Sequence, residues 1–294
     1  MTIKAWGCAV VVARLALPLR VDAQTYELSG TGLETVVLLH GEFSHPSAWQ
    51  RTLDALTPKY RVLTYARSLE DSLETQLADL ESLLDHLELA AVHLIGHSAS
   101  GVLSYSFAGQ HPTRVLSLCL VGGFTRLDAP LELKLRSINA SLEAGGVELA
   151  STVAAPWLWG SAYLYSNTPA LLDLSSEALH NALAGMLSLG DQRKWLRAVG
   201  CPVLVAVGSD DLLTPLRYSH EIVEWVKQGL GVLVTITGGG HNAPLEKPDE
   251  FNRILTGFLE RYASFTSSPW AIDDDEDDGD SGADYVDFND LERK

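Results

Sequence analysis

The sequence predicts an α/β fold: a mostly parallel central sheet with helices on both faces and a helical insertion. The first observation is a series of short apolar runs, rich in valine and leucine, which are typical of parallel strands covered on both sides by helices. These runs are Val36–Leu39, Val62–Tyr65, Val92–Ile95, Val115–Val121, Val203–Val207 and Val232–Ile236. The second is helical spacing of apolar residues between the runs, and the third is a gap in the strand series between Thr125 and Leu196.

Residues 1–22 form a leader whose structure the sequence leaves open. Its apolar stretches loosely resemble a secretory signal peptide, but Arg14 and Arg20 interrupt the pattern. No run reaches the roughly 18 apolar residues of a membrane span, so we expect no stable membrane insertion. Cys119 and Cys201 lie in or beside apolar runs, and no disulfide framework is present. We therefore expect a cytoplasmic protein, with secretion as the alternative.

The remaining core elements follow from local patterns. Ala23–Ser29 alternates between polar and apolar residues, which favours an antiparallel edge strand. Leucines at helical spacing predict a helix over Ser72–Leu89, with Asp71 and Glu74 as a capping pair at its start. Two further helices are predicted at Ala99–Gln110 and Pro248–Tyr262. Together these elements assign residues 23–126 and 197–264 to the α/β core.

Residues 127–196 are predicted to form a helical cap above the site. Helices are expected at Leu131–Ala144, at Gly145–Thr152 and around Leu171–Leu189. The aromatic residues of this insertion have two interpretations, because such side chains serve equally in a substrate pocket and in a hydrophobic core. They either line an apolar pocket or form the cap's own core; the candidates are Trp157, Trp159, Tyr163 and Tyr165.

Residues 265–294 are predicted to be an acidic disordered tail. Eleven acidic and two basic residues lie in 270–294, so this tail carries −9 of the net charge of −17. The chain offers no basic face for phosphate, which excludes nucleic acid as an expected partner. The tail is a solvated segment or, alternatively, a docking motif for a protein partner, since apolar residues stand among its acids: Tyr285, Phe288 and Leu291.

Ser98 lies in the segment Gly96-His97-Ser98-Ala99-Ser100-Gly101, directly after an apolar run and before a predicted helix. A serine in a sharp, glycine-flanked turn between strand and helix has the geometry of a nucleophile elbow. Asp210 and Asp211 follow one later strand, and His241 follows the last one. The order serine, aspartate, histidine, each after a strand, predicts a catalytic constellation.

Each residue of this constellation has a chemical reason to be there. The Ser98 hydroxyl is a weak nucleophile at neutral pH and needs a base, for which His241 is the candidate. One of the two aspartates would orient the imidazole. Backbone N–H groups must stabilise a developing oxyanion, and we expect them from Ala99 and from Glu42, with Phe43 as the second choice for the latter. Phe43 is also expected to line the pocket.

From Ala23 to Tyr262 the chain resembles the α/β-hydrolase superfamily, in its cofactor-independent branch of esterases, lactonases and carbon–carbon-bond hydrolases. The matching residues are His40-Gly41, the segment Gly96–Gly101, His111–Val115, Pro202–Asp211 with Pro215, and Gly240-His241 with Pro244–Pro248. The resemblance implies Asp211 rather than Asp210 as the triad acid, and no metal or organic cofactor.

The activity that the resemblance implies is cleavage of a carboxylic ester, lactone or related acyl bond through a covalent Ser98 intermediate. The apolar cap suggests a small hydrophobic acyl or aromatic group as substrate. Two alternatives remain. The same triad is used for carbon–carbon cleavage of ring-fission products, and a non-catalytic binding protein could retain the scaffold.

Two departures from the family pattern stand out. Ser100 occupies the position at which the elbow motif usually has its second glycine, and the Asp-x-Arg-Gly-x-Gly-x-Ser loop that usually follows the strand Val62–Tyr65 is missing. Its absence could widen the pocket or loosen the oxyanion hole. Among the histidines, His40 is expected to support the oxyanion loop and His97 to pack beneath the elbow. The others are expected at the surface or in the cap, without a role: His45, His86, His93, His111, His180 and His220.

Overall fold

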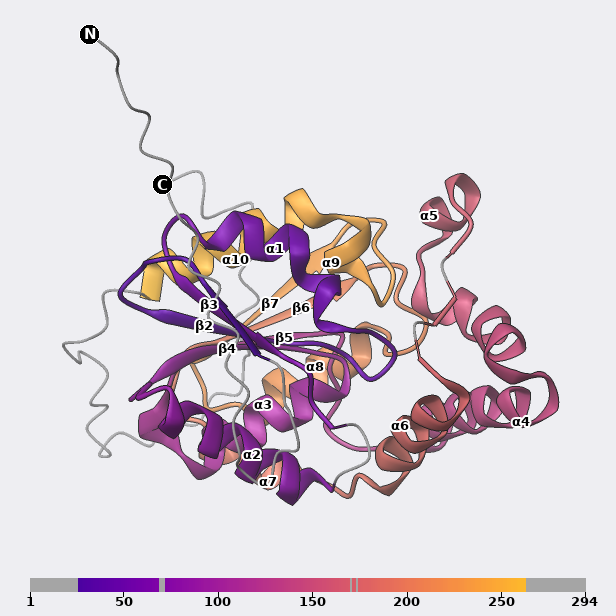
Figure 1. The fold of residues 1–294 in the computed structure, drawn as a ribbon, viewed down its shortest axis with the longest axis horizontal. Helices are drawn as coiled ribbons and strands as arrows, with labels where there is room; N and C mark the ends of the chain where they lie inside the picture. Colours follow the sequence, from indigo (N-terminus) through magenta and orange to yellow (C-terminus); the bar gives the residue numbers. More distant parts are fainter. Residues whose placement is uncertain (1–25, 69–71, 170, 173, 263–294) are drawn as a thin grey trace, which may run out of the picture.

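The computed structural model describes residues 26–68, 72–169, 171–172 and 174–262. A seven-stranded sheet occupies its centre, in the order β1-β3-β2-β4-β5-β6-β7 (Figure 1). The first strand pairs antiparallel with β3 at the edge, and all other neighbours are parallel. The strands are β1 (Tyr26–Ser29), β2 (Thr35–Leu39), β3 (Arg61–Tyr65), β4 (Val92–His97), β5 (Val115–Val121), β6 (Val203–Gly208) and β7 (Gly231–Ile236).

The six apolar runs are confirmed as parallel strands, each within two residues of its predicted bounds. The antiparallel edge strand is also confirmed over Tyr26–Ser29, and its predicted first residues lie outside the described part of the chain. Strands β4 and β6 run on to His97 and Gly208, so they end directly at the segments that carry Ser98 and Asp211.

Helices cover both faces of the sheet. Alternate residues of a strand point to opposite faces, and in these strands both sets are apolar, so each face needs a cover. In β2, Val37 and Leu39 belong to one apolar core, and Val36 and Leu38 belong to the other. The first core lies under α2 (Leu73–His86), α3 (Ala99–Gln110), α7 (Arg193–Ala198) and α8 (Leu216–Trp225); the second lies under α1 (Gln50–Leu56) and α10 (Pro248–Tyr262) (Figure 1).

Three helices project beyond the carboxyl ends of the strands: α4 (Ala129–Leu158), α5 (Ser161–Ser166) and α6 (Ser176–Ser188) (Figure 1). Helix α4 spans both helices predicted over Leu131–Ala144 and Gly145–Thr152. The two parts meet at a kink, where the backbone is non-helical at Gly145 and Gly146 and φ of Gly146 is +68°. The short elements are the 3-10 turns Pro46–Trp49 and Pro112–Arg114 and helix α9 (Ala243–Glu246). None of the helices in the described ranges is long and apolar enough to cross a membrane.

The structure corrects three details. Ser72 caps α2, since its hydroxyl accepts a hydrogen bond from the Thr75 N–H, whereas the proposed capping residue Asp71 lies outside the described residues. His93 is not a surface residue: it is fully buried in β4, where its Nδ1 is 2.8 Å from Ser117 Oγ. Helix α7, whose first residues were assigned to the cap, packs against α3 in the core; a Cβ on Gly109 would lie 2.4 Å from the Trp195 carbonyl oxygen. The predicted leader and acidic tail lie outside the described residues.

Candidate active site

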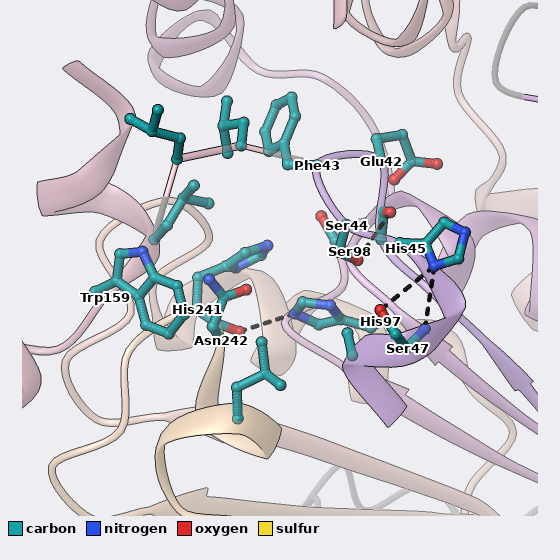
Figure 2. Close-up of a pocket in the computed structure, with 16 residues that line it drawn as sticks. Glu42, Phe43, Ser44, His45, Ser47, His97, Ser98, Trp159, His241 and Asn242 are labelled. Carbon is teal, nitrogen blue, oxygen red and sulfur yellow. Dashed lines mark hydrogen bonds between the residues drawn. The ribbon is translucent and has the colours of Figure 1, made fainter. Parts of the chain in front are cut away.

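Ser98 and His241 line one cavity of about 210 Å³ at the carboxyl ends of the strands. The loop after β2 forms one wall with Glu42 and Phe43, and the cap contributes Trp159 to the other side (Figure 2). Figure 2 shows the ring of His241 pointing towards Ser98. The sequence-predicted nucleophile and base, which are 143 positions apart in the chain, are thus brought to the same cavity.

The backbone at Ser98 adopts the conformation of a nucleophile elbow. Its φ of 59° and ψ of −128° lie in a region that non-glycine residues rarely occupy, and such strain is typical of functional sites. The turn is tight: a Cβ on Gly96 would lie 2.4 Å from Ser104 Oγ and 2.5 Å from the Ser100 carbonyl oxygen. The glycine at position 96 therefore allows the helix that follows Ser98 to approach β4.

Ser100 replaces the second glycine of the usual motif without disturbing this turn. It is fully buried, and its hydroxyl donates a hydrogen bond to the carbonyl oxygen of His40. The departure from the family pattern therefore adds a contact, because it ties the first turn of α3 to the loop that follows β2.

His241 is held by Asp211. The imidazole Nδ1 lies 2.9 Å from Asp211 Oδ2 and 3.0 Å from Thr214 Oγ1, and both His241 and Asp211 are buried. Since a carboxylate only accepts hydrogen bonds, Nδ1 carries the proton and Nε2 keeps its lone pair. Within the described part of the chain, Nε2 has no hydrogen-bond partner. Gly122, with φ of +56°, gives the ring space, since a Cβ there would lie 2.9 Å from Nδ1.

Asp211 is itself fixed by three donors. Its Oδ1 accepts hydrogen bonds from the backbone N–H groups of Leu213 and Thr214, at 2.9 and 2.8 Å, and its Oδ2 accepts one from Thr214 Oγ1. Asp210 does not approach His241; its carboxylate instead accepts a hydrogen bond from Ser209 Oγ. The geometry therefore agrees with the residue that the resemblance implied.

Ala99 is the first residue of α3, and Glu42 lies on the loop after β2. Both residues border Ser98 at the site. The N–H groups of a helix's first turn have no partner within the helix, so that of Ala99 is available to an anion at the site. The loop is braced from behind by Arg67, whose Nη2 donates to the His40 carbonyl at 3.0 Å and to Glu42 Oε1 at 2.8 Å.

Two further histidines near the cavity are neutral. Burial lowers the pKa of His97 to about 4, helped by the neighbouring His241, and lowers that of His40 to about 3, helped by Arg67. His97 Nε2 donates to the His241 carbonyl at 2.9 Å, and His40 Nδ1 donates to the Gly41 carbonyl at 2.9 Å. His40 thus contacts the loop after β2 as expected. His97 lines the cavity and is hydrogen-bonded to the loop that carries His241.

The structure separates the residues proposed for the pocket. Phe43 and Trp159 line the cavity, but Trp157 and Tyr163 do not. Trp157 packs against the main apolar core, and Tyr163 stacks on Trp159 with ring centroids 4.5 Å apart. Tyr165 is 92% exposed. Within the aromatic cluster, Trp159 therefore lines the pocket, whereas Trp157 belongs to the hydrophobic core.

The end of α4 is bonded to both loops that carry His241 and Asp211. The Leu158 carbonyl accepts from the Asn242 N–H at 3.0 Å, and the Trp157 carbonyl accepts from the Leu213 N–H at 3.1 Å. Glu246 joins the same junction, because its carboxylate accepts from the N–H groups of Gly160 and Gly240. Burial is the main cause that raises the pKa of Glu246.

Three residues to which the sequence assigned no site role contribute to the site, namely Thr214, Glu246 and Arg67, and His97, expected only to pack beneath the elbow, also lines the cavity. Thr214 had a local signal, since a threonine three residues after an aspartate can return a hydrogen bond to it. Arg67 is a charged residue two positions after the end of a buried strand, which is itself unusual. The contacts of Glu246 and His97 depend on tertiary packing and had no local signal.

Comparisons with known proteins agree with this geometry. The model of the alpha/beta hydrolase family matches residues 36–254. A putative carbamate hydrolase RutD from Caulobacter sp. (strain K31) is 26% identical, over 83% of this chain and 98% of the relative. One from Serratia proteamaculans (strain 568) is 30% identical, over 76% of this chain and 90% of the relative.

Solved structures show the same fold. A thermophilic esterase from Thermogutta terrifontis superposes with a TM-score of 0.74 at 22% identity, covering 85% of this chain and 98% of the esterase. The enol-lactonase from Burkholderia xenovorans LB400 superposes with a TM-score of 0.73 at 18% identity, covering 81% and 96%. With the family model spanning most of the chain and the seven-stranded, mostly parallel sheet in place, the chain belongs to the alpha/beta hydrolase family.

Proposed function

We propose that this protein is a serine hydrolase that cleaves a carboxylic ester, lactone or related acyl bond. Ser98 Oγ attacks the acyl carbon, His241 Nε2 takes the hydroxyl proton, and a tetrahedral intermediate forms. The leaving group departs with a proton from His241, which leaves an acyl group on Ser98. A water molecule, activated by the same Nε2, attacks the acyl carbon and releases the acid.

One observation carries the proposal: the His241 Nδ1 contact with Asp211 Oδ2 leaves Nε2 as a free acceptor on the Ser98 side of the cavity. Asp211 fixes this tautomer and stabilises the imidazolium that forms when Ser98 loses its proton. The N–H groups of Ala99 and Glu42 are the proposed donors to the oxyanion. Removal of one such donor typically reduces the rate by about 10²–10³.

The cavity favours a small substrate with an apolar part. Phe43, Trp159, Leu171, Leu172 and Leu245 supply apolar wall, and the volume is about 210 Å³. Phe43 and Trp159 lie on different elements, one on the loop after β2 and one at the end of α4, so the substrate would lie between core and cap. An acyl group of a few carbon atoms or a single aromatic ring fits this description.

A carbamate is the second candidate substrate class. The relatives described as putative carbamate hydrolases align with most of this chain at 26–30% identity. Carbamate cleavage proceeds through the same attack of a serine on a carbonyl carbon, so the site would need no additional group.

The first experiment is stopped-flow hydrolysis of p-nitrophenyl acetate, butyrate and N-methylcarbamate by the wild type and by Ser98→Ala. We expect p-nitrophenol release by the wild type alone, because without the hydroxyl no acyl-enzyme can form. Circular dichroism should show that both proteins are folded. Equal turnover by Ser98→Ala would disprove the proposed mechanism, and the ratio of the rates distinguishes ester from carbamate preference.

A further inference from the structure

Glu42 places a buried carboxylate beside the proposed oxyanion hole. Its side chain is only 9% exposed, and its own backbone N–H is one of the two proposed oxyanion donors. Glu42 and Ser98 line the same cavity, with Glu42 at its edge in Figure 2. A second negative charge near the forming oxyanion raises its energy, and a poorly hydrated site screens such repulsion weakly.

Arg67 is the cation that accompanies this carboxylate. Its Nη2 lies 2.8 Å from Glu42 Oε1, and its side chain is 2% exposed, so the pair is shielded from solvent. Among the described residues, the other Glu42 oxygen, Oε2, is buried without a hydrogen-bond partner. Within that part of the chain Arg67 is the cation paired with Glu42, and its removal would leave a buried, unpaired carboxylate.

Arg67 also fixes the position of the loop. The same Nη2 donates to the His40 carbonyl at 3.0 Å, and Nη1 donates to Gln76 Oε1 on α2. The His40 carbonyl accepts a second hydrogen bond from Ser100 Oγ, which comes from the elbow helix. The peptide group before Gly41 is thus attached to α2 and α3 through Arg67 and Ser100, and the side chain of Glu42, after Gly41, is attached to Arg67.

We propose that Arg67 is a positioning residue for the oxyanion loop and that its charge cancels the charge of Glu42 while the oxyanion forms. The missing loop after β3 therefore does not leave the hole unsupported, because Arg67, two residues after the end of that strand, holds residues 40–42. This inference rests on the proposed function. It predicts a loss of transition-state stabilisation rather than of substrate binding when Arg67 is removed.

The test compares Arg67→Met, Glu42→Gln and the double variant, with the ester that the wild type turns over best. For Arg67→Met we expect kcat to fall about 10²-fold, comparable to loss of an oxyanion donor, while KM changes less than about threefold. The affinity for a trifluoromethyl ketone, which forms a tetrahedral adduct with the serine, should fall in parallel with kcat. In the double variant kcat should recover at least about tenfold relative to Arg67→Met, because the unpaired charge is gone.

Arg114→Met is the matched control. Arg114 also donates to a carboxylate, that of Asp85 at 2.8 Å, and to a backbone carbonyl, that of Ala90 at 2.8 Å, but at the opposite end of β4. It should keep the wild-type kcat. Unchanged kcat in Arg67→Met, or a double variant no better than Arg67→Met, would overturn the inference.

The outcomes separate this inference from the proposed function. If the wild type shows no Ser98-dependent turnover, the proposed function itself has failed; if it does, only the Arg67 variants decide the inference. Should Arg67→Met not fold, Arg67→Lys replaces it, because lysine keeps the charge but cannot reproduce the guanidinium fork. Its kcat should fall with KM held, and a wild-type kcat in Arg67→Lys would contradict a positioning role.

Discussion

Asp210 and Asp211 are neighbours in sequence with the same side chain, yet only one of them meets His241. The difference comes from the turn after β6, in which the N–H groups of Leu213 and Thr214 converge on the Asp211 carboxylate and hold it beneath the imidazole. Asp210 is only partly buried, and its carboxylate contacts Ser209 instead. At the scale of single residues, backbone donors decide which carboxylate can serve the base.

This pair provides a matched test of the acid. In Asp211→Asn the side-chain amide can no longer hold Nδ1–H in the same way, so the imidazole loses its correct tautomer and its stabilisation as a cation. We expect kcat to fall by about 10³–10⁴. Asp210→Asn is the control and should stay within about twofold of the wild type. Steady-state kinetics of the two variants decide the matter, and a larger loss in Asp210→Asn would show that the acid is assigned wrongly.

At the scale of elements, the end of α4 is the point at which the cap meets the two loops of the site. Gly160 and Gly240 approach each other so closely that a Cβ on Gly240 would lie 2.3 Å from the Gly160 nitrogen. Glu246, on α9, accepts hydrogen bonds from both N–H groups. The end of α4 is therefore tied to the loop that carries His241.

Gly160→Ala tests this junction without touching a proposed catalytic group. The new Cβ would lie 2.9 Å from Glu246 Oε2 and 3.0 Å from the Gly240 nitrogen, which forces the two backbones apart. Since small displacements of a catalytic group are costly, we expect kcat to fall between about 10- and 100-fold.

Gly200→Ala is the control for this change, because nothing lies within 4 Å of a Cβ at that position. It should keep the wild-type kcat and melting temperature. Equal kcat values for the two alanine variants would show that the junction does not position His241.

The elements themselves were largely predictable. Valine- and leucine-rich runs identify buried strands, and the predicted bounds of α3 and α10 are those observed, because His111-Pro112 ends one and Pro248 begins the other. The cap was less predictable. Helix α4 continues past Thr152 to Leu158 with Pro156 inside it, because tertiary packing overrides the local signals that usually end a helix.

The candidate site likewise contains residues that the sequence predicts and residues that it does not. Ser98, Asp211 and His241 follow strands, so the parallel order of the sheet alone brings them to one edge. Arg67 reaches residues 40 and 42, and Glu246 reaches Gly160, across long stretches of sequence, and no period or motif signals such contacts. His93 differs from the expectation for a related reason: its strand is covered on both faces, so even a polar side chain within it is buried.

At the scale of the whole molecule, three histidines besides His241 are enclosed in the described part of the fold in their neutral form. Burial lowers the pKa of His40 to about 3, and those of His93 and His97 to about 4. Their pKa in the unfolded chain is about 6.5, so below that pH the unfolded state binds protons that the folded state does not. Stability is therefore present at neutral pH and is lost as the pH falls from about 6.5 towards 4, by about 1.4 kcal/mol per pH unit for each such histidine.

His93→Gln isolates one of these histidines away from the active site. The amide can still hydrogen-bond to Ser117 but does not titrate. The free energy of unfolding, measured with urea between pH 7 and pH 4.5, should fall less steeply with pH in this variant than in the wild type, whatever its stability at pH 7. His220→Gln, which removes an exposed histidine on α8, should follow the wild type. Parallel profiles for wild type and His93→Gln would contradict the account.

The central claim is that an acyl group is carried by Ser98. The most direct measurement is mass spectrometry of the wild-type protein quenched with acid during turnover of p-nitrophenyl butyrate, followed by peptide mapping. The account predicts one butyryl group per chain, located on Ser98 and absent from Ser98→Ala. Turnover without any acylated Ser98, or with the acyl group on another residue in both proteins, would contradict it.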